Sequence, residues 1–172
     1  MQKTKNIAII SIFTALLIGG QFALSAVSGI EIVTVLFITF AYVFGVRMSL
    51  FVANVFSLLR CFIFGFFPSV LILYLLYYNL FAVVAGVMGG KFKREYSIKK
   101  HLITTAVALL LTVCFTLLDN VITPLFFSYN AESTTAYWYA SLSTLVPQLI
   151  CVAVTVGLLF YPLHKVFSKM SH

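Results

Sequence analysis

Residues 69–100 read SVLILYLLYYNLFAVVAGVMGGKFKREYSIKK, and this stretch decides the fold. Residues 69–89 are almost entirely apolar, whereas residues 91–100 contain five Lys or Arg side chains. A run of about 20 apolar residues is long enough to cross the hydrocarbon core of a bilayer as an α-helix. Basic residues directly after such a run are typical of a cytoplasmic loop. The stretch therefore predicts a membrane-spanning helix followed by an inner loop.

The whole chain has a membrane-like composition. Of its 172 residues, 62% are hydrophobic and only 9% are charged. Soluble domains carry about 25% charged residues, so we expect lipid to cover most of the exterior of this protein. The alternation of apolar and polar residues that is typical of barrel strands is absent. The composition predicts a single, all-α integral membrane domain over residues 1–172.

Six apolar segments predict six transmembrane helices. They cover residues 7–27, 31–44, 48–66, 69–89, 102–122 and 137–163. The first is longer than the apolar core of a signal peptide, which has about 7–15 residues, so we expect it to be retained. The second is short for a crossing. Ser28-Gly29, Pro68 and Pro124 are expected to end the first, third and fifth helices, and Pro147 lies inside the sixth.

The distribution of charge predicts how the chain is threaded through the membrane. With the N-terminus inside, ten of the eleven basic residues are cytoplasmic: Lys3, Lys5, Arg47, Lys91, Lys93, Arg94, Lys99, Lys100, Lys165 and Lys169. The outer loops carry Glu31 and Glu132 and no Lys or Arg. This bias excludes dual topology and predicts that both termini are cytoplasmic. It also accounts for the net charge of +7 without nucleic-acid binding.

Arg60 is the basic residue that the topology rule does not explain. It lies about five residues from the outer end of the third apolar segment, roughly 8 Å deep at about 1.5 Å per residue. Glu31, Asp119 and Asn120 are expected near the same depth. Charges inside a bilayer face a cavity or a partner. One interpretation is structural: Arg60 snorkels, or it forms an ion pair with Asp119 or Glu31 that holds the helices together. The other is functional: Arg60 binds an anionic or carbonyl group of a ligand, while Asp119 or Glu31 binds a donor of the same ligand.

Aromatic and amide residues add to this polar set. Tyr74 and Tyr78 are one helical turn apart, Asn79 is adjacent, and Gln148 follows Pro147. Tyrosine combines an apolar ring with a polar tip, which suits a flat heteroaromatic ligand. The alternative is that these residues form hydrogen bonds between helices.

A stripe of small residues marks one face of the first helix. Ser11, Ala15, Gly19 and Ala23 recur every four residues and share a face. Because helices in lipid associate through close packing at small residues, the stripe predicts a docking face for another membrane subunit; the alternative is packing within the bundle. The same two interpretations apply to a second stripe, which is Ala82, Gly86 and Gly90.

Catalytic and metal-binding motifs are absent from the sequence. There is no P-loop, HExxH or paired-carboxylate motif, and His101, His164 and His172 have no metal-ligand spacing. We therefore expect no enzyme activity, cofactor or metal, and no ATP hydrolysis by the chain itself.

The chain resembles the substrate-binding S component of energy-coupling factor (ECF) vitamin transporters over nearly its whole length. The similar features are six spans, inner termini, small size, the small-residue first helix, the segment Gly29-Ile30-Glu31-Ile32-Val33-Thr34 and Phe44-Gly45. The resemblance implies high-affinity capture of a vitamin or related micronutrient at a bacterial cell membrane. It also implies docking on a transmembrane coupling (T) subunit driven by two cytoplasmic ATPases.

The resemblance also implies roles for particular residues. The family's AxxxA-type docking motif maps onto Ala15-x-x-x-Gly19, with Gly in place of the second Ala. The family's pocket is built from outer loops and helices four to six. That implicates Glu31, Tyr74, Tyr78, Asn79, Asp119, Asn120 and Gln148 in substrate binding. Arg60 joins this set through the charge argument alone.

Three other functions remain open from the residues. A self-sufficient small transporter or channel would need no ATPase. An intramembrane enzyme would need a catalytic pair, and only Glu31 with Asp119 could supply one. A structural subunit would use the aromatic and amide residues for packing alone.

Overall fold

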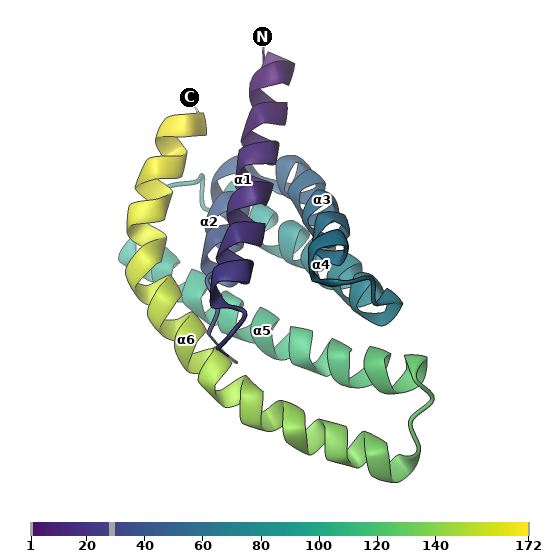
Figure 1. Cartoon of the computed structure of the whole chain (residues 1–172). Helices are drawn as coiled ribbons and strands as arrows, with labels where there is room; N and C mark the ends of the chain where they lie inside the picture. Colours follow the sequence, from purple (N-terminus) through teal and green to yellow (C-terminus); the bar gives the residue numbers. More distant parts are fainter. Residues whose placement is uncertain (1, 28–29, 172) are drawn as a thin grey trace.

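The computed structural model describes residues 2–27 and 30–171, without the side chains of residues 2, 3 and 171. All regular structure in this part of the chain is helical, which confirms the predicted all-α class (Figure 1). The helices are α1 (Gln2–Leu24), α2 (Val33–Phe44), α3 (Val46–Phe64), α4 (Pro68–Lys91), α5 (Ile98–Phe126) and α6 (Ala131–Ser171). The predicted end of the first helix at Ser28-Gly29 lies outside the described residues.

Five of the helices are long and apolar enough to cross a membrane, namely α1, α3, α4, α5 and α6. This agrees with a multi-pass membrane protein. In Figure 1 the start of α1 and the end of α6 lie at the same end of the bundle, and α5 and α6 run side by side to the turn that joins them at the opposite end.

Helix α2 is the short element at the centre of the bundle. It has 12 residues, of which 11 are buried, and its length is only about 18 Å at about 1.5 Å per residue. Phe37 packs edge-on against Tyr78 and Phe81 of α4, with ring centroids 5.2 Å apart in each pair. The predicted helix over 31–44 is thus confirmed with a later start, and Glu31 lies in the connection that precedes it.

The prediction that Pro124 ends the fifth helix is wrong. Helix α5 continues through Pro124 to Phe126. A proline removes one backbone donor, but the next turn still closes here because the Phe127 N–H donates to the Thr123 carbonyl at 3.1 Å. Pro68 does not end the third helix either: α3 ends at Phe64, before Gly65 with φ 99°, and Pro68 opens α4.

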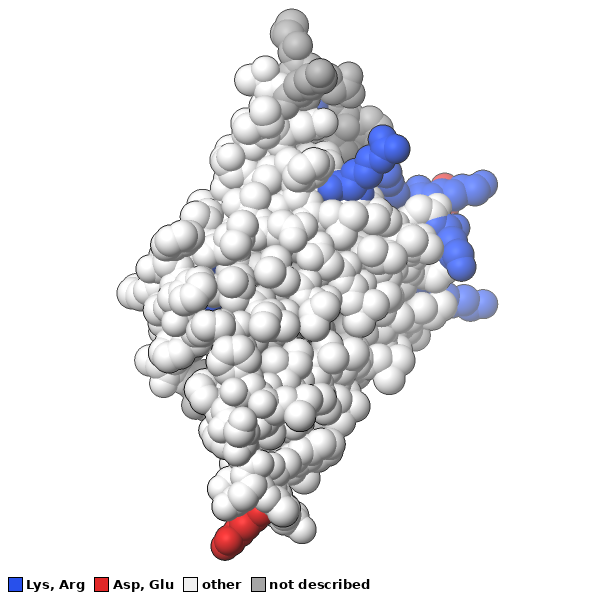
Figure 2. Space-filling view, turned by 90° about the vertical axis from the view of Figure 1, so that its right-hand side faces the viewer, with Lys and Arg blue, Asp and Glu red and all other residues white. Residues whose placement is uncertain are grey.

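Hydrogen bonds gather several basic segments at one end of the bundle. The Tyr42 hydroxyl of α2 donates to the Glu95 carbonyl at 2.8 Å, and His164 Nε2 of α6 donates to the Arg94 carbonyl at 2.9 Å. Both acceptors lie in the connection between α4 and α5. Figure 2 shows most of the visible Lys and Arg side chains on the right-hand side of the molecule, in its upper half, and an acidic side chain protruding at the lower end.

The second small-residue stripe packs inside the bundle. Ala82 and Gly86 are buried, and a Cβ added at Gly86 would lie 2.6 Å from the backbone nitrogen of Val46. The absence of a side chain at Gly86 lets α4 contact the start of α3 closely. The packing interpretation therefore holds for this stripe, except at the exposed Gly90.

Candidate functional site

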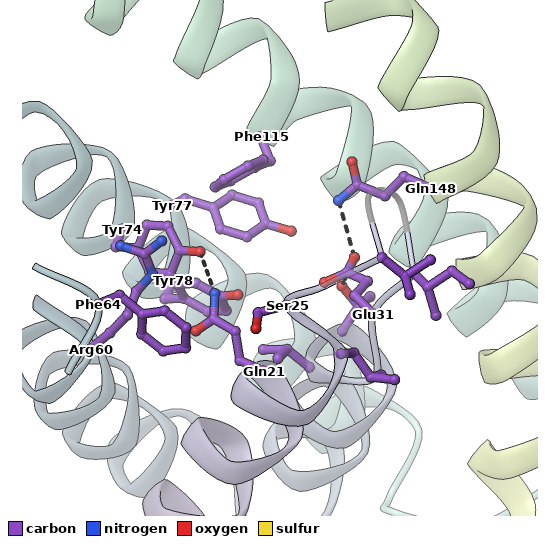
Figure 3. Close-up of a pocket in the computed structure, with 15 residues that line it drawn as sticks. Gln21, Ser25, Glu31, Arg60, Phe64, Tyr74, Tyr77, Tyr78, Phe115 and Gln148 are labelled. Atoms are coloured by element: carbon purple, nitrogen blue, oxygen red, sulfur yellow. Dashed lines mark hydrogen bonds between the residues drawn. The ribbon is translucent and has the colours of Figure 1, made fainter.

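A cavity of about 390 Å³ opens between the α1–α2 connection and helices α1, α3, α4, α5 and α6 (Figure 3). Its volume is in the range of small-molecule sites, which is about 300–1,000 Å³. Five of the eight predicted substrate-binding residues line it: Glu31, Arg60, Tyr74, Tyr78 and Gln148. They come from four separate segments of the chain, so the fold brings together what the sequence separates.

One end of the cavity is formed around Arg60. The guanidinium carbon lies 4.2 Å from the ring centroid of Tyr74 and 5.3 Å from that of Phe64. Arg60 Nε is buried and has no hydrogen-bond partner among the described residues. Gln21 Nε2 donates to the Tyr74 hydroxyl at 2.8 Å, while Gln21 Oε1 is buried and accepts no hydrogen bond from the part of the chain that the structure describes. This end of the cavity therefore contains a donor, Arg60 Nε, and an acceptor, Gln21 Oε1, that form no hydrogen bond with the described residues.

Arg60 forms neither of the ion pairs considered from the sequence. Within the described residues, the one pair at salt-bridge distance is Lys100 with Glu95, at 3.1 Å. The rings of Tyr74 and Phe64 supply cation–π attraction to the guanidinium, but they neutralise no charge. A bundle-holding ion pair with Asp119 or Glu31 is thus absent from this arrangement.

The other end of the cavity is formed by Glu31, which is partly buried. Its Oε1 accepts hydrogen bonds from Thr34 Oγ1 at 2.8 Å and from Gln148 Nε2 at 3.2 Å. Its backbone N–H donates to Cys151 Sγ at 3.4 Å, and the thiol donates back to the Glu31 carbonyl at 3.3 Å. Burial raises the pKa of the Glu31 carboxyl, and the two side-chain donors oppose that rise. The contacts with α6 fix this carboxyl in place.

An aromatic wall joins the two ends. Tyr77 and Phe115 pack with ring centroids 4.8 Å apart, and Tyr74 and Tyr78 lie 5.3 Å apart. The side chains of Tyr77 and Tyr78 are buried, yet no hydrogen bond of their hydroxyls occurs in the described part of the structure. Their hydroxyl groups are available to a molecule in the cavity.

The other three predicted residues lie outside this cavity. Asp119 lines an adjoining hollow of about 280 Å³ that shares Arg60 and Tyr74 with it. The Asp119 carboxylate accepts from Thr123 Oγ1 and from the Tyr137 hydroxyl, both at 2.7 Å.

The two asparagines form contacts between helices. Asn79 exchanges side-chain amide hydrogen bonds with Asn54 of α3, at 3.1 and 3.2 Å. Asn120 donates to Ser141 Oγ of α6 at 2.8 Å. For these residues the structure favours the interhelical interpretation.

Sequence reasoning missed several lining residues, chiefly Gln21, Tyr77 and Phe115. Gln21 had a usable signal, since it is a polar amide inside the first apolar segment. Tyr77 is adjacent to Tyr78 in the sequence, but it is not among the residues predicted to bind substrate. Phe115 had no signal, because it is one of 18 phenylalanines.

The small-residue stripe of α1 faces outward. Ser11, Ala15, Gly19 and Ala23 are all exposed, and a Cβ added at Gly19 would meet nothing within 4 Å. The first three line an apolar groove of about 590 Å³ between α1 and α3. Phe13 and Leu17, on another face of α1, are buried in the core. Packing within the bundle does not use the stripe.

Within the described residues, no three His, Cys, Asp or Glu side chains lie together as a metal site. Comparison with known proteins gave no match to a family model, to a curated protein or to a solved structure. The fold and the cavity define the class of protein: an all-helical chain with several helices of membrane-spanning length and a polar hollow inside the bundle.

Proposed function

We propose that the chain is the substrate-binding S component of an ECF-type importer, which captures a vitamin or related small micronutrient from outside the cell. The observation that carries this proposal is the cavity with a buried guanidinium nitrogen that has no hydrogen-bond partner within residues 2–27 and 30–171. A buried polar group without a hydrogen bond is costly, and a cation at membrane depth normally has a functional partner. A bound small molecule would satisfy it.

The proposed topology has six crossings, with both termini in the cytoplasm of a bacterial cell. Helix α2 makes the short crossing and is shielded by the other helices. The common end of α1 and α6 supports an even number of crossings (Figure 1). The basic α4–α5 connection supports an inner position for that end of the bundle.

The proposed partners are a transmembrane coupling subunit and two ATPases. The outward stripe on α1 supports a helix–helix interface, because small exposed residues let a second helix approach closely in lipid. The chain carries no nucleotide-binding motif, so the energy for release into the cell would come from the partners.

The test is mass spectrometry of small molecules that remain bound when the chain is purified in mild detergent. We expect the wild-type chain to retain a compound that the Arg60→Gln variant loses by at least about tenfold. Arg47→Gln is the matched control, because Arg47 lies at the start of α3 and outside the cavity. Equal retention by both variants, or transport by the chain alone in liposomes, contradicts the proposal.

A further inference from the structure

The two ends of the cavity present opposite chemistry. In Figure 3, Arg60, Phe64, Tyr74 and Gln21 lie on one side, and Glu31 with Gln148 lies on the other. Within the described residues Glu31 and Arg60 line the same cavity without forming a salt bridge. A cation and a carboxyl group therefore face one hollow from opposite ends.

The Arg60 end requires an acceptor. A guanidinium group has donors only, and Arg60 Nε is buried and donates to none of the described residues. The guanidinium carbon lies over the rings of Tyr74 and Phe64, which supply cation–π contact but no hydrogen-bond acceptor in the plane of the group. Charge-assisted hydrogen bonds to an oxyanion are the strongest that such a donor forms. A carboxylate or a carbonyl oxygen of the ligand fits this end.

The Glu31 end requires a donor. Both hydrogen bonds that the carboxyl accepts, from Thr34 and Gln148, go to Oε1. Oε2 receives no hydrogen bond from the described residues. The Gln148 amide also turns its donor toward Glu31, which leaves its own oxygen as an acceptor. An N–H group of the ligand fits this end, and a cationic one gains most from the carboxylate.

The space between the ends suits an unsaturated ring. Tyr77 and Phe115 form a wall along it, and the Tyr77 hydroxyl points into the space between the two ends (Figure 3). Aromatic side chains favour stacked or edge-on contact with another flat ring. The hydroxyls of Tyr77 and Tyr78 can bond to polar atoms on the ring's edge.

We infer that the cavity takes a flat bipolar molecule, with an anionic or carbonyl group at Arg60, an N–H donor at Glu31 and an unsaturated ring between them. This inference rests on the proposed function. It also fixes the orientation of the ligand, because the reversed molecule would place its N–H donor against the donors of Arg60 and its acceptor against the ionised carboxyl of Glu31.

The test uses defined probes in detergent and isothermal titration calorimetry. The bipolar probes are 4-(aminomethyl)benzoate and the longer 4′-(aminomethyl)biphenyl-4-carboxylate. The single-ended controls are 4-methylbenzoate, which lacks the amine, and benzylamine, which lacks the carboxylate. We expect at least one bipolar probe to bind about tenfold or more tightly than either control.

Variants assign each end. Arg60→Gln should weaken the bipolar probe and 4-methylbenzoate by about tenfold and leave benzylamine unchanged, whereas Glu31→Gln should weaken the bipolar probe and benzylamine alone. Arg60→Lys keeps the charge if Arg60→Gln fails to fold, and it should bind more tightly than a neutral variant. Arg47→Gln should bind all probes like the wild type.

Three results overturn the inference: single-ended probes that bind as well as the bipolar ones, a reversed assignment of the two ends, or no binding of either bipolar probe. These failures are distinguishable from failure of the proposed function. If a small molecule still copurifies and depends on Arg60, capture of a substrate stands and only its bipolar character is wrong.

Discussion

At the scale of single residues, Glu31 combines a fixed position with an altered acidity. Burial raises the pKa of its carboxyl, so the folded chain holds this proton at pH values where an unfolded chain has released it. The stabilisation that this protonated group gives is therefore fully present below the ordinary pKa of glutamate. It is lost as pH rises through the higher pKa of the folded state. The other titratable groups around Glu31 are Arg60, Tyr74, Tyr77 and Tyr78, which line the same cavity, and Cys151, which contacts its backbone.

The matching prediction compares Glu31→Gln with the wild type. As pH rises above about 4, the free energy of unfolding of the wild type should fall relative to that of Glu31→Gln. The fall should be at most about 1.4 kcal/mol for each pH unit. Thermal unfolding in detergent over a pH series measures it, and Glu132→Gln, on the exposed first turn of α6, is the control. A difference that is constant with pH would contradict a raised pKa.

Asn79 was predicted from the sequence to bind substrate, whereas in the structure its side chain forms a contact between two helices. Its amide pairs with Asn54 across α3 and α4. We expect Asn79→Ala to lower thermal stability while the retained ligand stays unchanged. In a double-mutant cycle with Asn54→Ala, the coupling should be about 0.6 kcal/mol, the average for such bonds in membranes. If Asn79→Ala loses the ligand while its thermal stability is unchanged, Asn79 takes part in substrate binding and the packing interpretation is wrong.

At the scale of elements, the contact of α4 with the start of α3 depends on a missing side chain. A Cβ at Gly86 would lie 2.6 Å from the Val46 backbone nitrogen, whereas one at Gly90 would meet nothing within 4 Å. We expect Gly86→Ala to destabilise the fold by about 1–3 kcal/mol through overpacking, and Gly90→Ala to be neutral. Thermal unfolding of the two variants measures the difference, and equal midpoints would contradict close packing at Gly86.

The outward stripe of α1 supports a prediction about coupling. Gly19→Leu should leave ligand retention intact, because Gly19 does not line the polar cavity, and should abolish uptake by blocking the approach of a partner helix. The control is Gly157→Leu, since Gly157 is also exposed and has open space around its Cα. Uptake is measured in cells that express each variant in place of the wild-type chain. Normal uptake by Gly19→Leu would show that the stripe is not the docking face.

Helix existence was predictable from the sequence, and helix ends were less so. Hydropathy identified all six helices, including the short buried α2, because each apolar run is bounded by glycine, proline or charge. Pro124 misled because a proline in the last turn of a helix costs only one hydrogen bond. The site residues that could be predicted were those with a charged side chain next to or within an apolar segment, such as Arg60 and Glu31. Gln21 and Phe115 reach the cavity through tertiary packing, which periodicity along one helix cannot reveal.

At the scale of the whole molecule, every functional proposal depends on which end of the bundle faces outward. Residue 132 lies in the first turn of α6, and residue 95 lies in the basic connection before α5. The proposed threading therefore puts them on opposite sides of the membrane. We expect Glu132→Cys to react with an impermeant maleimide in intact cells, and Glu95→Cys to react only after permeabilisation. The background should have Cys61, Cys114 and Cys151 replaced by serine or alanine. If the two positions label with the opposite order, the cavity opens toward the cytosol, and capture from outside is wrong whatever its ligand.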